Sequence, residues 1–307
     1  IDYTGGGCPH ILAEPQSTNV LPYSEDFSQS SWTKSDVSIE SGYLAPDGTD
    51  SAYKVTKTGS NGHLVDLTTG GNTGTKSIYA KTSSGTGTAI LFNSVNTYFT
   101  ITEEWQRFDI QKNGLDFFYS ADFRGTSTLT EIIIWGAQSE ALSYPTSYIP
   151  TSGSTVTRNQ DIFTRDGIGS LINSTEGVLF VEMAAFNNDG TFRMIALSDG
   201  TINNRIRINY TSTDNQVQSR IVVGGVTQAE INKFGVSTIT DFIKIALSYK
   251  VNEVKLYING TLIGTDTSAT MPSALNTLAL DDGSGGNKFF GKVKQLQVYD
   301  TALTDTQ

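Results

Sequence analysis

The stretch FIKIALSYKVNEVKLYINGTLIG, residues 242–264, decides the fold class. In its first half, bulky apolar side chains occupy every second position, and smaller or charged side chains fill the positions between them. A period of two is that of a β-strand with one buried face. Asn259-Gly260 then separates two alternating segments and predicts a type I′ hairpin turn, because both central residues of that turn need positive φ. The stretch therefore predicts an antiparallel sheet.

The same period recurs along most of the chain. Between residues 77 and 136, short alternating segments are separated by clusters of Gly, Ser, Thr or Asn, and a second series begins at Glu176. EIIIWG, residues 131–136, is apolar on both faces and predicts a central strand of a sandwich. A length of 307 residues is about twice that of a typical domain. We expect an all-β protein of two consecutive antiparallel β-sandwich (jelly-roll) domains.

Two segments depart from the strand pattern. Residues 226–234, VTQAEINKF, predict one or two helical turns. Thr304 is expected to be the N-cap of a helix at the C-terminal end. Because the chain begins with Ile1 and ends inside that expected helix, we expect it to be part of a longer protein.

A segment without strand character divides the chain near its middle. Residues 143–161, SYPTSYIPTSGSTVTRNQD, contain two prolines, which cannot donate ladder hydrogen bonds, and a Ser/Thr/Gly run with little to bury. We therefore expect domains at residues 18–158 and 159–307. Residues 1–17 are expected to be an extended leader that packs along a neighbouring chain or an upstream domain, because they hold too few apolar side chains to fold alone.

Charge and cysteine content narrow the partners. The formal net charge is −10 and the pI is about 4.7, which opposes binding to nucleic acid and to anionic lipid. No apolar run is long enough to predict membrane insertion. Cys8 is the only cysteine, so an internal disulfide is excluded.

Catalytic patterns are not evident in the sequence. His10 and His63 are the only histidines, and no G-x-S-x-G nucleophile motif occurs. A lyase would need a Tyr or His base, for which Tyr210, Tyr249 and Tyr257 are candidates, but no matching arginine, glutamine and histidine motif accompanies them. We expect a protein that is not an enzyme, with a polysaccharide lyase or hydrolase on the second domain as an alternative.

Two residue groups are candidates for binding a glycan. A sugar ring packs its C–H face on an aromatic side chain, which makes Tyr98 and Trp135 candidates; the alternative for Trp135 is a core position. On the second domain, alternation turns Arg205 and Arg207 away from the core, and two further arginines lie on flanking strands. These arginines are Arg193, Arg205, Arg207 and Arg220. They predict one face for the carboxylate or sulfate groups of an acidic polysaccharide, or else an ordinary solvated strand face.

A glycine-rich loop offers oxygen ligands for calcium. In LDDGSGGNK, residues 280–288, Asp281, Asp282 and Asn287 are the candidate ligands. An ordinary Asp-Gly turn is the alternative, and no cofactor is certain from the sequence.

Several ordered motifs resemble known families. The motifs PDGTDSAYKV, KSIYAK, EWQRFDI and IIIWGAQSEALSYPTSYIPTSGSTVTRNQD, within residues 11–161, resemble the carbohydrate-binding-type jelly-roll module common in phage tail and other virion proteins. FIKIALSYKVNEVKLYINGTLIG and FFGKVKQLQVYDTALTDTQ, within residues 176–307, resemble a laminin-G-like (concanavalin A-like) sandwich.

The resemblance implies a glycan-binding accessory protein of a phage tail or capsid appendage. Its expected location is the virion surface or the extracellular space, and its expected partners are glycans, other virion proteins and further copies of itself. A spacer or decoration protein without a ligand site remains the alternative of a different class.

Overall fold

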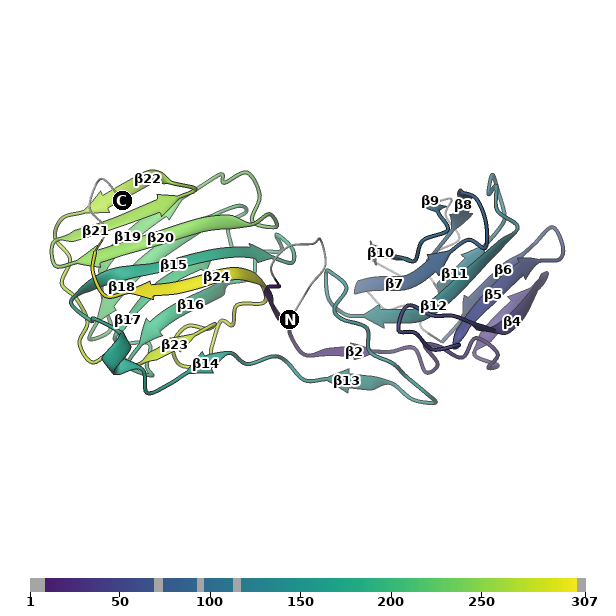
Figure 1. Ribbon diagram of the computed structural model, residues 1–307, viewed down its shortest axis with the longest axis horizontal. Coiled ribbons are helices and arrows are strands. Elements are labelled where there is room, and N and C mark those ends of the chain that lie inside the picture. Colours follow the sequence, from purple (N-terminus) through teal and green to yellow (C-terminus); the bar gives the residue numbers. More distant parts are fainter. Residues whose placement is uncertain (1–8, 69–73, 93–96, 113–116, 303–307) are drawn as a thin grey trace. The chain divides into compact units, whose positions relative to one another are not determined.

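The computed structural model describes residues 9–68, 74–92, 97–112 and 117–302, and within them the protein is built of β-strands (Figure 1). Apart from the strands, the described residues hold one short 3₁₀ turn, η1, at Gly169–Leu171. The predicted all-β class is therefore confirmed. Among the described residues, no helix is long and apolar enough to cross a membrane.

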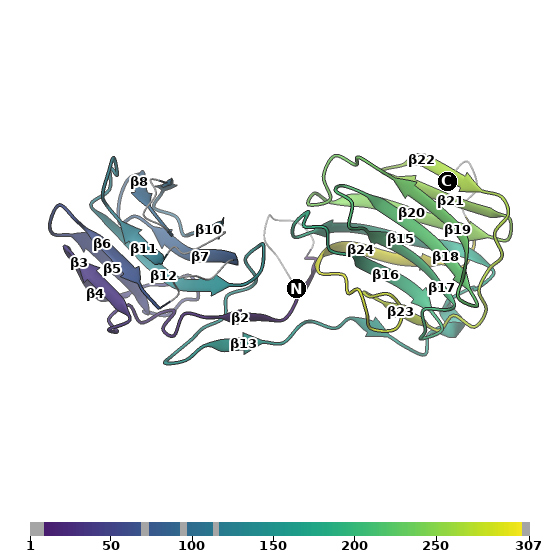
Figure 2. The same ribbon diagram turned by 180° about the vertical axis from the view of Figure 1, so that it is seen from behind.

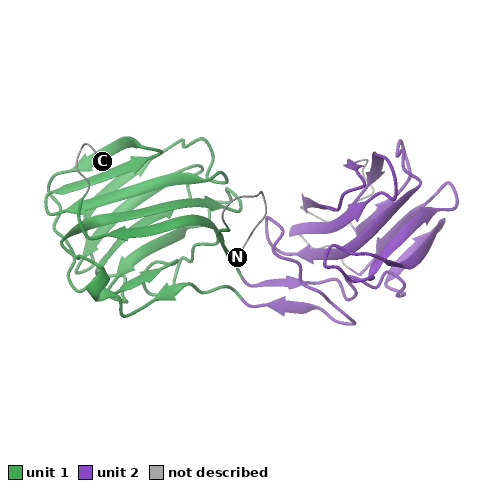
Figure 3. Cartoon of the chain, viewed as in Figure 1, with its two compact units in different colours: residues 1–15, 160–307 green, residues 16–159 purple. Residues whose placement is uncertain are grey.

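The chain forms two compact units (Figure 3). Unit 2 comprises residues 16–159, and unit 1 comprises residues 1–15 together with 160–307. The chain thus passes from unit 1 into unit 2 and back, so unit 2 is an insertion near the N-terminal end of unit 1. Each unit has its own core.

Unit 2 is a sandwich of two five-stranded antiparallel sheets. The first sheet has the order β10-β7-β12-β5-β4, with the bounds Gln106–Lys112, Gly74–Lys81, Glu131–Glu140, Ala52–Lys57 and Val37–Tyr43. The second has the order β3-β6-β11-β8-β9, with the bounds Trp32–Ser35, His63–Asp66, Phe118–Asp122, Gly87–Ile90 and Tyr98–Ile101. A two-stranded ribbon of β2 (Ser17–Asn19) and β13 (Val156–Arg158) completes the unit.

The central strand of the first sheet carries side chains on two buried faces. Ile132 and Ile134 of β12 pack into the main core of unit 2, beside Phe27 and Trp32. Their neighbour Ile133 faces the other way. The strand predicted from EIIIWG is thus central and covered on both sides.

Unit 1 is a sandwich of two six-stranded antiparallel sheets, of which strands β15 to β24 are labelled in Figure 2. One has the order β1-β24-β15-β20-β21-β22, with the bounds Ile11–Ala13, Gly291–Tyr299, Glu176–Ala185, Ile243–Lys250, Glu253–Ile258 and Thr261–Asp266. The other has the order β14-β23-β16-β17-β18-β19, with the bounds Thr164–Arg165, Thr277–Ala279, Arg193–Ser198, Arg205–Tyr210, Val217–Val223 and Val226–Lys233.

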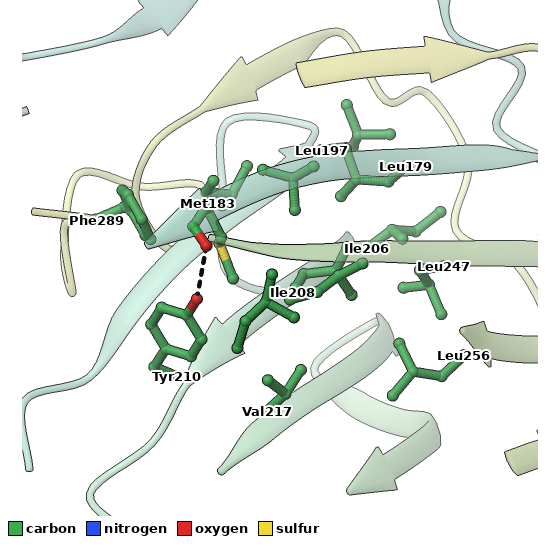
Figure 4. Packing of buried hydrophobic residues seen from close by; sticks show 14 of the residues in the cluster. Leu179, Met183, Leu197, Ile206, Ile208, Tyr210, Val217, Leu247, Leu256 and Phe289 are labelled. Atoms are coloured by element: carbon green, nitrogen blue, oxygen red, sulfur yellow. Dashed lines mark hydrogen bonds between the residues drawn. The ribbon is translucent and has the colours of Figure 1, made fainter. Parts of the chain in front are cut away.

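Alternating side chains of both sheets fill the core of unit 1 (Figure 4). Leu179 and Leu247 come from one sheet, and Leu197 and Ile208 from the other; all four are fully buried. Tyr210 lies among them and donates a hydrogen bond from its hydroxyl to the carbonyl of Met183, at 3.1 Å. Because the core takes every second residue of each strand, the residues between them face away from it.

The hairpin prediction is confirmed. Asn259 and Gly260 have φ of 49° and 79°, and they join β21 to β22 by direct pairing of Ile258 with Thr261. The Asn259 side chain also accepts a hydrogen bond from the backbone N–H of Lys244, which fixes the turn against β20.

Two sequence expectations need correction, and one falls outside the described residues. Residues 226–233 form strand β19, not a helix, because their backbone pairs along β18 from Val217 to Val223. The leader does not stand apart from the domains, since Ile11–Ala13 is the edge strand beside β24 in unit 1. The expected cap at Thr304 lies outside the described residues.

Candidate ligand-binding site

Three arginines gather on the side of β17 and β18 that faces away from the core of unit 1. Ile206, Ile208 and Ile221 point into the core, so strand alternation turns Arg205, Arg207 and Arg220 to the opposite side. Arg207 and Arg220 are directly opposite each other in the register of the two strands. We call Arg205, Arg207 and Arg220 the arginine face.

The arginine face combines one buried and two half-buried arginines, and their guanidinium groups are incompletely bonded. Arg207 is 3% exposed and donates to Gln218 Oε1 at 3.2 Å and to the thioether sulfur of Met194 at 2.7 Å, a weak acceptor. Arg205 donates to the backbone carbonyl of Asp282 at 2.6 Å. The Nε atoms of all three arginines are buried and have no hydrogen-bond partner among the described residues.

The three cations disfavour one another. Burial, followed by the charges of Arg205 and Arg220, lowers the pKa of Arg207 to about 10. Burial also lowers the pKa of Arg205, with Arg220 adding to the effect and Asp282 opposing it. A pKa of about 10 leaves Arg207 protonated at neutral pH, so the positive charge persists although its surroundings disfavour it.

Two carboxylates partly balance these charges. Glu230 of β19 is opposite Arg220 in the strand register and forms an ion pair with it. Hydrogen bonding from Asn232 lowers the pKa of Glu230, against the effect of burial, and the pairing with Arg220 lowers it further. Gln218 donates to Asn232 at 2.9 Å and to Glu230 at 3.2 Å, which holds these side chains in one network. With Asp282 counted, three cations face two anions.

The loop of residues 281–288 lies against the same side of the sheet. Ser198 donates to the carbonyl of Gly283 at 3.1 Å, and the N–H of Met194 donates to the carbonyl of Asn287 at 3.1 Å. A Cβ on Gly283 would lie 2.7 Å from Ser198 Cβ, and its φ is 94°, so this contact requires glycine. The loop is therefore held on β16, next to the arginine face.

Asp282 and Asn287, two of the proposed calcium ligands, form hydrogen bonds within this loop. Asp282 Oδ1 accepts hydrogen bonds from the N–H groups of Ser284 and Gly286, both at 3.0 Å, and its Oδ2 accepts one from the Asn287 amide at 3.1 Å. No group of three or more His, Cys, Asp or Glu side chains in the described ranges converges as a metal site. The geometry is that of the Asp-Gly turn, and calcium at this loop stays a prediction without structural support.

Arg193 does not join the other arginines, contrary to the prediction of one face. In the strand register it is opposite Tyr210. On β16 its side chain points to the same side as those of Ile195 and Leu197, which is the core side, and it is 1% exposed. There it forms an ion pair with Asp189 at 2.8 Å. Its alternation with Ile195 was a signal in the sequence that places it inward.

The aromatic candidates lie apart from each other in unit 2. Trp135 is 5% exposed and packs between the rings of Tyr79 and Tyr148, whose centroids are 5.4 and 4.6 Å from its own. Trp135 therefore occupies a core position, which was the alternative to a ligand-binding role. Tyr98 is a half-buried residue of the edge strand β9 in the other sheet, and its hydroxyl accepts a hydrogen bond from the N–H of Thr126 at 2.8 Å.

Four of the five residues considered for catalysis are buried, and Tyr257 on β21 is half-buried. Burial raises the pKa of Tyr210 and of Tyr249, and their hydroxyls donate to the carbonyls of Met183 and Asn173. His10 is 7% exposed, with its ring against Phe242. His63 is in unit 2, beside Tyr119. A tyrosine with a raised pKa is a poor general base at neutral pH.

Part of the chain matches a family of known fold. Residues 179–307 match the model described as the concanavalin A-like lectin/glucanases superfamily (Laminin_G_3). The matched region lies within unit 1 and is similar to this superfamily over less than half of the chain. No curated protein matches the sequence.

Solved structures resemble parts of the chain at low identity. The CBM40 module of the Ruminococcus gnavus IT-sialidase is 15% identical with a TM-score of 0.38, over 47% of this chain and 95% of that one. Sheep galectin-11, solved in complex with glycerol, is 9% identical with a TM-score of 0.32, over 45% of this chain and 97% of that one.

Proposed function

We propose that the protein binds glycans without transforming them, and that the arginine face of unit 1 holds an acidic group of the glycan. The observation that carries the proposal is the set of three neighbouring arginines whose Nε atoms are buried and have no hydrogen-bond partner among the described residues. A buried polar donor without a partner is costly, so such a cluster is complementary to a ligand that brings acceptor oxygens.

The charge of the arginine face favours an anion over a neutral ligand. Three arginines face Glu230 and Asp282 in a protein whose formal net charge is −10. A carboxylate or sulfate offers several oxygens to guanidinium groups in the paired geometry that arginine prefers. Bound there, it supplies the acceptors that the Nε atoms lack and offsets the burial and the repulsion that together depress the pKa of Arg207.

The chemical class of the ligand is proposed from the fold of unit 1. The superfamily matched by residues 179–307 is described as one of lectins and glucanases. Within unit 1, Tyr210 and Tyr249, two of the three tyrosines considered as bases, are buried in hydrogen-bonded positions, which favours the binding function over the hydrolytic one. A uronic acid, a sialic acid or a sulfated sugar each combines a carbohydrate with the required charge.

The test is a glycan array probed with the wild-type chain and with the double variant Arg205→Ala/Arg207→Ala. We expect wild-type binding to acidic glycans and at least about a hundredfold loss in the variant, because two charge-assisted contacts disappear. The matched control is Lys250→Ala/Lys294→Ala, which removes the same charge from β20 and β24 of the other sheet of unit 1. Equal losses in both double variants would attribute binding to net charge alone.

A blank array for a folded wild-type chain would contradict the proposal. It would favour the alternative of a spacer or decoration protein. Carboxyl-reduced or desulfated forms of any glycan that binds should lose their affinity, and retention of affinity would show that the acidic group is not what is recognised.

We also propose that the protein is an accessory component exposed on a virion surface, or otherwise extracellular, together with other virion proteins and further copies of itself. The support is the resemblance of the motifs within residues 11–161 to modules of phage tail and other virion proteins. Analytical ultracentrifugation over a range of concentrations tests the self-association. A single monomeric species up to high micromolar concentration would contradict it.

A further inference from the structure

A cleft of about 520 Å³ opens on the same side of the same sheet as the arginine face. Thr164 of β14 and Ala279 of β23 line it, and the loop of residues 281–288 lines it with Asp281 and Lys288. Its volume is in the range of sites for small molecules, about 300–1,000 Å³. The proposed function makes no use of this cleft.

A buried carboxylate is open to the cleft. Asp281 is 5% exposed, and its Oδ1 accepts a hydrogen bond from the N–H of Gly283 at 2.7 Å. Its Oδ2 accepts no hydrogen bond from the described residues, and Asp281 is one of the residues lining the cleft. An ionised carboxylate is an acceptor only, so this oxygen is able to accept a hydrogen bond from a hydroxyl group in the cleft. Asp166 and Asp199 add two more carboxylates to the lining, against one lysine.

The cleft and the arginine face lie on one cross-strand row. Direct register pairs run from Thr164 to Ala279, then to Ala196, then to Arg207, then to Arg220. Ala279 and Arg207 are thus two strand spacings apart, about 10 Å. Two linked sugar rings span a distance of this order.

The loop of residues 281–288 touches both places. Asp281 lines the cleft, while the backbone carbonyl of the next residue, Asp282, accepts the hydrogen bond from Arg205. Ser198 fixes the loop to β16 between them. The loop therefore separates a cationic part of the sheet from an anionic cleft.

We infer that the cleft is a second subsite for an uncharged sugar residue, whose hydroxyls donate to Asp281, and that the preferred ligand carries such a residue next to its acidic one. This inference rests on the proposed function, because the acidic residue is held at the arginine face. An acidic residue is excluded from the cleft by the carboxylates that line it.

The experiment compares acidic sugars alone and linked to uncharged ones by isothermal titration calorimetry. The probe pairs are glucuronic acid with a hyaluronan tetrasaccharide, and N-acetylneuraminic acid with sialyllactose. We expect at least one linked probe to bind about tenfold or more tightly than its acidic sugar alone, because the cleft supplies additional charge-assisted hydrogen bonds.

Two variants test the cleft. Asp281→Asn removes the charge while its amide oxygen still accepts from Gly283, and Thr164→Trp places bulk in the cleft from an exposed position of an edge strand. Both should abolish the gain from the linked sugar and leave the affinity for the acidic sugar unchanged. Thr265→Trp, at an exposed position of the edge strand β22, is the matched control and should change neither.

The outcomes separate the two proposals. If a linked probe retains its full gain in both cleft variants, the subsite is wrong and the arginine face stands. The subsite is also wrong if linked probes bind no better than acidic sugars alone. If no acidic sugar binds in either form, the proposed function fails and the subsite fails with it.

Discussion

Unit 1 and unit 2 each carry an unusual set of side chains on a sheet face turned away from the unit's own main core. In unit 1 this is the arginine face. In unit 2 it is an aromatic face on the sheet β10-β7-β12-β5-β4, composed of Tyr43, Tyr79, Trp105, Trp135 and Tyr148. From composition alone the aromatic face is the more typical sugar-binding surface. The contacts within the two faces indicate the reverse.

The aromatic groups are already provided with partners. Trp135 packs between two tyrosine rings and donates from its indole nitrogen to Ser51 Oγ at 2.8 Å. Lys54 lies over the ring of Tyr43 at 5.3 Å, and Lys81 over that of Trp105 at 5.4 Å. These contacts make the aromatic face a second, smaller core. The arginine face, by contrast, gathers three unpartnered Nε donors and charges that repel, where the sheet of the aromatic face has one such donor, on Arg107. These are the conditions that a ligand relieves.

Replacing Trp135 should produce the largest effect and would sharpen the contrast. We expect Trp135→Ala to lower the free energy of unfolding of unit 2 by about 3–5 kcal/mol, because it empties a buried aromatic site. Urea unfolding followed by fluorescence of the remaining tryptophans reports on unit 2 alone, since Trp32, Trp105 and Trp135 all belong to it.

The half-buried Trp105 is the control for this measurement. Trp105→Ala should cost clearly less, since its ring is only partly covered. A Trp135→Ala protein of unchanged stability that had lost glycan binding would reverse the comparison and make the aromatic face the ligand site.

Replacing a buried arginine of the arginine face should not lower the free energy of unfolding. We expect Arg207→Met to leave the free energy of unfolding of unit 1 unchanged or to raise it by about 1–4 kcal/mol, because it removes a buried cation that its neighbours disfavour and keeps the apolar stem. Urea unfolding followed by circular dichroism measures this free energy. A loss of more than about 1 kcal/mol would mean that the arginine face serves the stability of the fold.

Glu230 competes with a ligand for Arg220, so its removal should strengthen binding. We expect Glu230→Gln to bind a sulfated glycan about three- to tenfold more tightly at neutral pH, measured by calorimetry. The loss of a partly exposed ion pair costs only about 1 kcal/mol or less. Glu253→Gln, an exposed carboxylate on β21, is the control. Weaker binding in Glu230→Gln would show that the arginines need this carboxylate for their position.

Acid should produce the smallest effect. The pKa of Glu230 is lowered in the folded protein, chiefly by the hydrogen bond from Asn232, and that of Asp282 is lowered by hydrogen bonds from Ser284, Asn287 and Gly286 that outweigh its burial. A lowered folded pKa gives stability that is complete above the unfolded value of about 4 and is lost as pH falls through the folded value.

The midpoint of urea unfolding of unit 1 should therefore decrease as the pH falls below the unfolded value of about 4. The decrease should be shallower in Glu230→Gln, in which one of the three shifted carboxylates of unit 1, Asp199, Glu230 and Asp282, is absent. An identical pH profile in wild type and variant would contradict the contribution of Glu230.

Much of the arginine face could be predicted from alternation. The apolar residues Ile206, Ile208 and Ile221 set which side of each strand is buried, and that alone places Arg205, Arg207 and Arg220 on the other side. The same rule, applied to Arg193 with Ile195 and Leu197, would have placed Arg193 in the core, where the structure has it.

The sequence by itself determined the all-β class, the hairpin at Asn259-Gly260 and the side of the sheet on which Arg205 and Arg207 lie, because these depend on a period of two and on local backbone preference. It could not determine that Arg207 is opposite Arg220, that Ile11–Ala13 pairs with β24, or that the loop of residues 281–288 separates the cleft from the arginine face. Those facts depend on register and on contacts between distant segments. Such contacts follow from the packing of the whole sandwich, in which burial of the shared core decides which strands become neighbours.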